Sequence, residues 1–245
     1  MKKLVAYVTS ALPDREFSVD LVLAMGEHGV DMVELGIPFS DPVADGPVIE
    51  KANNLALKNG FKIADALYIG EKVADKIDTL WMGYFNPFYK KGFEFFLSEA
   101  QRIGIKGMIV PDMPYEESLV YRPLFEKREI ALIDFVAPTD SEERIKKIVS
   151  KSKLFVYMVA YAGITGSDKK EDLSTIIQSV KKYTKTPLYI GFGVDEKSAK
   201  QKAKDVDGVI VGSAFVKILL EDLTYKEKID RITQLSARIK DLINS

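Results

Sequence analysis

Eight short apolar runs recur along the chain, and longer stretches with helical periodicity separate them. The runs cover residues 4–9, 32–35, 79–84, 107–111, 131–137, 154–160, 187–192 and 208–212. Most are apolar at consecutive positions, which is typical of parallel strands covered on both faces. Eight strands alternating with helices predict an α/β fold, a single-domain (β/α)8 (TIM) barrel over residues 1–245. A doubly wound open sheet is the alternative, but the number of runs and the glycines after the last two favour the barrel.

The composition limits the kinds of binding and catalysis that this chain can perform. A formal net charge of -1 gives no indication of a nucleic-acid or membrane surface, and no apolar run approaches the roughly 20 residues of a membrane span. The absence of cysteine excludes disulfides and thiol nucleophiles and fits a cytoplasmic location. A single histidine, His28, cannot form a multi-histidine metal site, so no metal is expected. Acid/base chemistry must fall mainly to carboxylates, tyrosine or lysine.

Glu34 lies inside the second apolar run, between Val33 and Leu35. A carboxylate buried there is costly or has a raised pKa unless a cation pairs with it. The eight runs contain no arginine and no internal lysine, so a buried ion pair is a weak explanation. Active sites of such barrels lie at the C-terminal ends of the strands, where Glu34 is expected. The pattern therefore predicts a general acid and base that works near neutral pH.

Two aspartates follow in the loop before the next expected helix. Pro47 suits the first position of that helix, which makes Asp45 a reasonable helix cap. On the residues alone, capping and catalysis explain Asp45 equally well. For Asp41, which precedes Pro42, capping is the better explanation.

Glycine-rich segments follow the last three expected strands. GITG (163–166) follows the sixth, GFG (191–193) the seventh, and GSAFVK (212–217) the eighth, where a helix begins. Small residues let backbone N–H groups approach an anion, and barrels frequently bind phosphate at the last two strand ends. The pattern therefore predicts a phosphate site. The lysine-rich run KSAKQKAK (197–204) is instead expected to be a solvated helix face.

Longer motifs resemble a known family, the tryptophan synthase α subunit. They are ELGIPFSDPVADGP (34–47), NPFYKKG (86–92), VPDMPYEES (110–118), AYAGITG (160–166), GFGV (191–194) and VGSAFVK (211–217), and they cover nearly the whole chain in the family's order. The resemblance implies a lyase of tryptophan biosynthesis that cleaves indole-3-glycerol phosphate to indole and glyceraldehyde 3-phosphate. It implies no cofactor in this chain, and a pyridoxal-phosphate β subunit that receives indole within an αββα complex.

The resemblance also implies roles for individual residues. Glu34 and Asp45 correspond to the family's catalytic carboxylates. The residues expected to bind substrate are the apolar pocket residues Tyr7, Ile49 and Phe192, the tyrosines Tyr84 and Tyr157, the loop residue Thr165, the strand-end glycine Gly191, and, at the phosphate, Gly166, Gly193, Gly212 and Ser213. Asp41, together with Pro38 and Asn86, is expected at the β-subunit interface.

Some features depart from the family pattern. The family usually begins with an extra helix before the first strand, which this sequence lacks, and TSALPD (9–14) stands where TAGDPD is common. Two other functions compete: a different phosphate-binding barrel, such as a phosphosugar isomerase or an indole-3-glycerol phosphate synthase, and a non-catalytic partner that activates a β subunit. The lack of strand-end lysines disfavours the first, and Glu34 and Asp45 disfavour the second.

Overall fold

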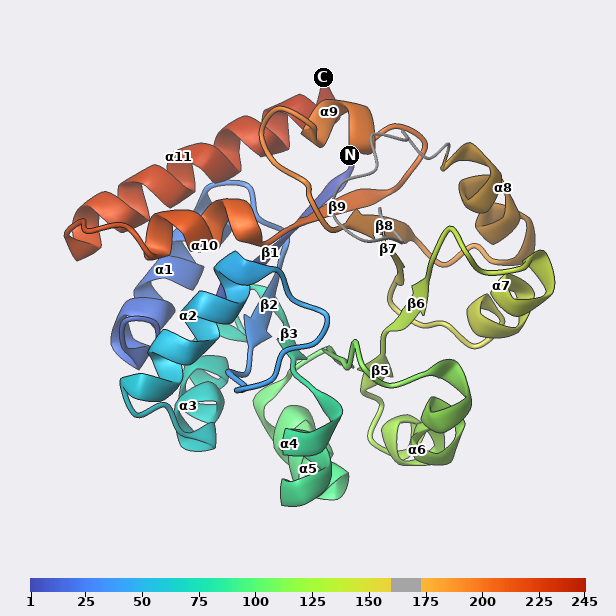
Figure 1. Cartoon of the computed structure of the whole chain (residues 1–245), viewed down its shortest axis with the longest axis horizontal. Coiled ribbons are helices and arrows are strands. Elements are labelled where there is room, and N and C mark those ends of the chain that lie inside the picture. Colours follow the sequence, from blue (N-terminus) through green and yellow to red (C-terminus); the bar gives the residue numbers. More distant parts are fainter. Residues whose placement is uncertain (160–172) are drawn as a thin grey trace.

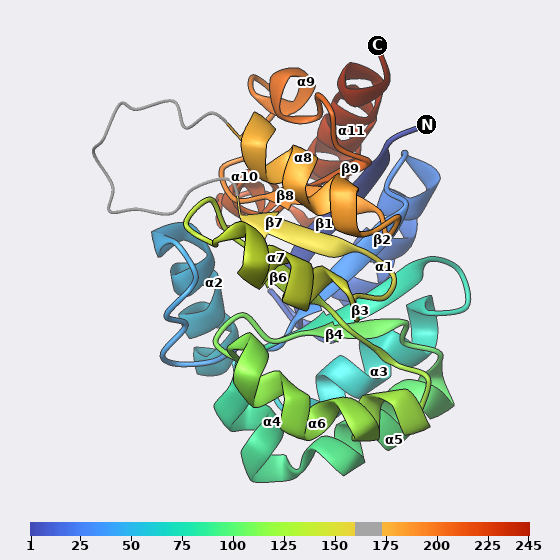
Figure 2. The same ribbon diagram turned by 90° about the vertical axis from the view of Figure 1, so that its right-hand side faces the viewer.

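The computed structural model describes residues 1–159 and 173–245, in which nine parallel strands form one sheet. The sheet order is β5-β4-β3-β2-β1-β9-β8-β7-β6, and helices surround it (Figure 1, Figure 2). The strands are β1 (Lys3–Thr9), β2 (Met32–Gly36), β3 (Asp78–Met82), β4 (Gly107–Ile109), β5 (Ala131–Leu132), β6 (Asp134–Val136), β7 (Val156–Val159), β8 (Leu188–Gly191) and β9 (Gly208–Val211). The predicted barrel is confirmed.

The fifth predicted strand is divided in two. β5 pairs with β4, and β6 pairs with β7. Ile133, between them, still donates its N–H to the carbonyl oxygen of Met108 at 3.0 Å. One apolar run therefore forms both edges of the sheet, and a single residue separates them. The barrel is nearly closed, with an interruption between β5 and β6, so the open-sheet alternative is wrong.

Helices of very different length connect the strands. They are α1 (Arg15–Glu27), α2 (Pro47–Lys58), α3 (Ile63–Val73), α4 (Phe85–Lys91), α5 (Phe93–Ile103), α6 (Tyr115–Lys127), α7 (Glu142–Val149), α8 (Ser174–Tyr183), α9 (Ala199–Lys202), α10 (Ser213–Leu219) and α11 (Tyr225–Asn244). Ser141 caps α7, and Thr224 with Glu227 forms a capping box at α11. Across the described ranges, no helix is long and apolar enough to cross a membrane.

Strand residues alternate between two apolar cores. Leu4, Ala6 and Val8 of β1 belong to the core between sheet and helices, whereas Val5 belongs to the barrel interior. On β2, Met32 also belongs to the interior. Because successive side chains of a strand point to opposite faces, Glu34 shares the inward face with Met32. The alternation thus aims this carboxylate into the barrel near the C-terminal end of β2.

A buried ion pair joins the sheet to the helical layer. The Asp134 carboxylate of β6 pairs with the Arg122 guanidinium of α6 and accepts a hydrogen bond from the Ser152 hydroxyl at 2.8 Å. Both charged side chains are buried. Burial raises the pKa of the Asp134 carboxyl in spite of the opposing effects of Arg122 and Ser152. Desolvation of this pair is therefore costly, and each charge depends on the other.

Replacing Arg122 with methionine is expected to lower the free energy of unfolding by about 3–5 kcal/mol, because an unpaired carboxylate stays buried. Urea denaturation near neutral pH measures the change. The double variant Arg122→Met/Asp134→Leu removes both charges and should recover most of the loss. A single variant as stable as the wild type would contradict the assigned role of the pair.

Candidate active site

A cavity of about 210 Å³ opens where the C-terminal ends of the strands meet. It takes residues from β1, β2, β3, β7 and β9, from α2 and the loop before it, and from the segments after β8 and β9. The lining residues are Tyr7, Glu34, Ala44, Asp45, Gly46, Ile49, Met82, Tyr157, Phe192, Gly193, Val194, Ile210, Gly212 and Ser213. Both predicted carboxylates and most of the predicted substrate residues therefore meet at one place.

Glu34 is an unpaired acid in this cavity. Its side chain is 2% exposed, and among the described residues its Oε1 has no hydrogen-bond partner. Burial, and then the nearby Asp45 charge, raise the pKa of Glu34 from 4.5 to about 8. The carboxyl is therefore mostly protonated at neutral pH, as a general acid must be before it donates a proton.

Asp45 does not cap the helix that follows it. The N-cap of α2 is Gly46, and no side chain bonds to the first turn from that position. The Asp45 carboxylate accepts hydrogen bonds from the Asn53 amide, at 3.4 Å, and from the Tyr84 hydroxyl. Burial raises the pKa of Asp45 from 3.8 to about 6, although the two hydrogen bonds oppose this change. Capping of α2 by Asp45 is therefore wrong, and the catalytic role of Asp45 stays a prediction.

Tyr84 contacts the loop that carries Asp45 from the side away from the cavity. Its side chain is almost fully buried, stacks on Phe39 at 5.6 Å between ring centroids, and accepts the Ala44 N–H at 3.1 Å. Tyr84 does not line the cavity. Its contact with a substrate therefore stays a prediction, whereas its contact with Asp45 is direct.

Two glycines give room to the tyrosines of the cavity. A Cβ on Gly36 would lie 2.2 Å from the Tyr7 hydroxyl oxygen, and one on Gly191 would lie 2.3 Å from that of Tyr157. Neither glycine lines the cavity. Gly191, predicted to bind substrate, leaves room for the Tyr157 ring, and its contact with a substrate stays a prediction.

The predicted phosphate end is formed by the segments after β8 and β9. Gly193 has a φ of +66°, and Phe192 has one of +67°, so two successive residues lie in the left-handed region. Gly212 is the N-cap of α10, and Ser213 is its first residue. Thr165 and Gly166, which were predicted to contact substrate, lie outside the described residues.

The three predicted interface residues differ in exposure. Asp41 and Asn86 are exposed, whereas Pro38 is buried. The Ser40 hydroxyl donates to the Asp41 carboxylate, and Val43 in the same loop is 80% exposed. The loop thus presents an acid and an apolar side chain to the outside, and its contact with a β subunit stays a prediction.

Two residues with contacts at the site were missed from the sequence. Asn53 lies on the buried side of α2 together with Ala52 and Ala56, and this apolar spacing was the available signal. Lys202 was expected to be solvated, but it is half-buried and donates to carbonyl oxygens of the loop after β8. Nothing in the lysine-rich run distinguishes it from Lys200, which is exposed.

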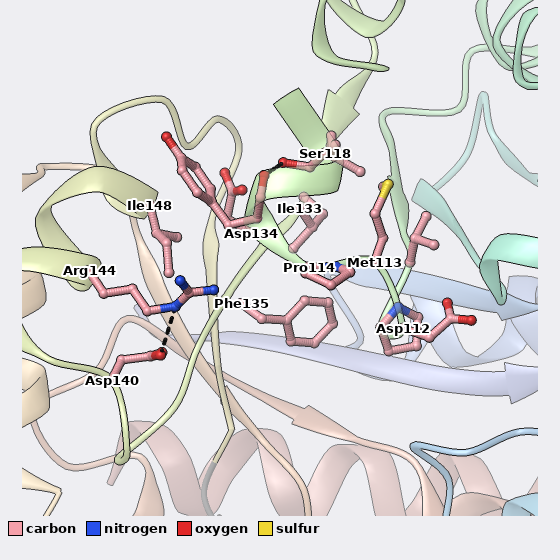
Figure 3. A pocket seen from close by; sticks show the side chains of 14 residues that line it. Asp112, Met113, Pro114, Ser118, Ile133, Asp134, Phe135, Asp140, Arg144 and Ile148 are labelled. Atoms are coloured by element: carbon pink, nitrogen blue, oxygen red, sulfur yellow. Dashed lines mark hydrogen bonds and ion pairs between the residues drawn. The ribbon is translucent and has the colours of Figure 1, made fainter. Parts of the chain in front are cut away.

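A second cavity, of about 250 Å³, lies beside the ends of β4 to β6 (Figure 3). Its charged groups already have ion-pair or hydrogen-bond partners. Arg144 pairs with Asp140, as the dashed line in Figure 3 shows, and with Glu116. Asp112 accepts the Phe85 N–H at 2.8 Å. No unpaired acid comparable to Glu34 is therefore found there, and within the described ranges no group of His, Cys, Asp and Glu side chains could hold a metal ion.

Known proteins match this chain over its length. The family model described as "Tryptophan synthase alpha chain" matches residues 1–244. The tryptophan synthase alpha chain of Wolinella succinogenes is 53% identical over 247 residues, covering 100% of this chain and 97% of that protein. The structure of tryptophan synthase subunit alpha from Campylobacter jejuni gives a TM-score of 0.86 at 32% identity, covering 97% of this chain and 95% of that chain. A structure of Mycobacterium tuberculosis tryptophan synthase gives 0.88 at 31% identity, covering 100% and 93%.

The raised pKa of Glu34 predicts how stability depends on pH. Between its ordinary pKa of 4.5 and its folded pKa of about 8, the folded state keeps a proton that the unfolded state releases. Stability contributed by this group is therefore complete below the lower value and is lost as the pH rises through the upper one. Glu34→Gln has no proton to lose, and it should exceed the wild type in stability by roughly 2–5 kcal/mol near pH 9.

Urea denaturation of both proteins at several pH values measures this difference. The difference in unfolding free energy should grow as the pH rises from the ordinary pKa of Glu34 to its folded value. A difference that does not depend on pH would show that the carboxyl is not protonated preferentially in the folded state.

Proposed function

The chain belongs to the tryptophan synthase alpha chain family, and we propose that it cleaves indole-3-glycerol phosphate by a retro-aldol reaction to indole and glyceraldehyde 3-phosphate. The family places the chain in tryptophan biosynthesis, and its alpha chain carries no cofactor. One observation supports the lyase chemistry above all others. Glu34, with a pKa of about 8, and Asp45, with a pKa of about 6, line the same cavity. At neutral pH one is a protonated acid and the other a carboxylate.

Two proton transfers by Glu34 make up the proposed reaction. Glu34 first protonates C3 of the indole ring, which turns the ring into an indolenine that can accept electrons. The resulting carboxylate then takes the proton from the hydroxyl on the adjacent side-chain carbon. That carbon becomes the aldehyde, and the electron pair of its bond to C3 returns to the ring and restores indole. Glu34 ends protonated, as it began.

Asp45 stabilises the charge that develops on the ring. As a carboxylate it accepts a hydrogen bond from the indole N–H, which becomes positively charged when C3 is protonated. The hydrogen bonds from Asn53 and Tyr84 hold this carboxylate in place and keep it ionised at neutral pH. The cost of reorganising the site during the reaction is therefore small.

The two ends of the substrate are proposed to bind at different parts of the cavity. Tyr7, Ile49 and Phe192 provide apolar surface for the indole ring. Backbone N–H groups at Gly193, Gly212 and Ser213 are proposed to bind the phosphate, which fixes the reacting carbon near Glu34. Thr165 and Gly166 are proposed to complete this end.

A β subunit is the proposed recipient of indole. The similar Mycobacterium tuberculosis structure is one of tryptophan synthase. For this chain we propose an αββα complex in which pyridoxal phosphate belongs to the β subunit. The exposed Asp41, on the loop that Pro38 begins, and the exposed Asn86, on α4, are the proposed contacts.

Glu34→Gln and Asp45→Asn are each expected to lower indole formation from indole-3-glycerol phosphate at least about a thousandfold, because each removes a group that acts only in the reaction. Indole release is measured with and without a β subunit, and circular dichroism checks that both variants fold. Near wild-type turnover by either variant would refute its assigned role. Activation of a β subunit by a wild-type chain that itself releases no indole would support a non-catalytic partner.

The pH dependence of kcat/KM should be bell-shaped, with limbs near the pKa values of about 6 for Asp45 and about 8 for Glu34. Below the first value Asp45 is protonated and cannot stabilise the ring cation, and above the second Glu34 has no proton to donate. Tyr84→Phe removes a hydrogen bond that lowers the pKa of Asp45, so the acid limb should move to higher pH. An acid limb that stays in place in this variant would contradict the assignment of that limb to Asp45.

A further inference from the structure

Lys202 of α9 reaches back to the loop that follows β8. Its Nζ donates to the carbonyl oxygens of Phe192, at 3.0 Å, and Gly193, at 2.7 Å. A Cβ built on Gly193 would lie 3.2 Å from the same Nζ, so the ammonium lies directly against this loop. An ammonium has three N–H donors, and these two bonds leave one donor without a partner among the described residues.

These two hydrogen bonds determine where the neighbouring N–H groups point. Both peptides are trans, and in a planar trans peptide the C=O and N–H point in opposite directions. The Phe192 carbonyl that faces Lys202 therefore turns the Gly193 N–H away from the lysine. The Gly193 carbonyl does the same for the N–H of Val194. Within the described ranges neither N–H donates a hydrogen bond inside the protein, and both residues line the cavity.

The backbone of the loop after β8 has an unusual conformation, and Lys202 is placed to stabilise it. Phe192 and Gly193 are successive residues in the left-handed region, which an L-residue such as phenylalanine seldom adopts. Ser198 also bonds to the Gly193 carbonyl, at 3.3 Å, but the ammonium is the only charged donor to the two carbonyls among the described residues. Charge-assisted hydrogen bonds are the stronger kind.

The positive charge of Lys202 also matters because the residues that line the cavity are otherwise acidic or uncharged. The described lining residues include two acids, Glu34 and Asp45, and no lysine or arginine. A phosphate monoester carries up to two negative charges near neutral pH. Lys202 lies behind two of the lining residues, Phe192 and Gly193, and brings a positive charge to the end of the cavity where phosphate is proposed to bind.

We propose that Lys202 is a positioning residue for the phosphate: it orients the N–H groups of Gly193 and Val194 toward the anion and offsets the anion's charge. The inference rests on the proposed function, since it assigns a residue to the phosphate end of that site. Its neighbour Lys200 provides a matched control, because Lys200 lies on the same short helix, carries the same charge and is exposed.

The test compares two probes on four proteins: the wild type, Lys202→Met, Lys202→Arg and Lys200→Met. The probes are indole-3-propanol phosphate and indole-3-propanol, which differ only in the phosphate, and calorimetry measures their dissociation constants. Lys202→Met should weaken the phosphate ester about ten- to a hundredfold, the size of a lost charge-assisted interaction, and change the alcohol less than about twofold. With indole-3-glycerol phosphate the same variant should raise KM by a similar factor and leave kcat within about threefold.

The other variants distinguish positioning from a merely structural role. Lys202→Arg, which keeps a charged donor, should recover most of the affinity for the ester, and Lys200→Met should match the wild type. An ester affinity that is unchanged in Lys202→Met, or an equal loss for both probes, would overturn the inference. If the wild type itself binds the ester no better than the alcohol, the phosphate end of the proposed function fails, independently of the variants.

Discussion

Closure of the parallel sheet is the constraint on which the candidate site depends. One apolar run forms both β5 and β6, and each piece completes one edge of the sheet. Since all strands are parallel, their C-terminal ends form one ring, and residues that are distant in sequence come together there. Tyr7 of β1, Glu34 of β2 and Tyr157 of β7 line one cavity for this reason. In an open sheet β5 and β6 would lie at opposite ends, and no ring of strand ends would surround Glu34.

Two buried carboxylates have opposite environments in the barrel: one has a charged partner and the other has none. Asp134 faces the helical layer and has both a cation and a hydroxyl as partners, so its charge is compensated. Glu34 faces the interior, where no described residue compensates it, and its pKa rises to about 8 instead. A buried carboxyl that keeps its proton at neutral pH is costly to ionise but useful as an acid. The surrounding strands are almost entirely apolar. Burial of their side chains stabilises the fold and offsets this local cost.

The sequence predicted those features that single residues or short runs carry. The apolar runs predicted the strands, and Glu34 could be identified because no basic residue lay in any run. Features that depend on three-dimensional neighbours could not be predicted in this way. Whether Asp45 capped a helix depended on where α2 begins, and the bonds from Asn53 and Tyr84 join separate elements. The division of residues 131–137 follows from barrel closure, and Lys202 has the same local sequence environment as its exposed neighbours.

The protonation states at the site also bear on how it can bind an anion. If Glu34 and Asp45 were both ionised, a phosphate ester would enter a cavity with two negative charges in a low dielectric, where repulsion is strong. Because the pKa of Glu34 lies above neutral pH and that of Asp45 lies below it, only one of these charges is present near neutrality. The shift that keeps Glu34 protonated for the proposed reaction would therefore also lower the electrostatic cost of binding a phosphate ester. Lys202, behind Phe192 and Gly193, is proposed to offset the charge on the substrate itself. The proposed acid catalysis and the proposed anion binding thus depend on the same balance of charges across one cavity.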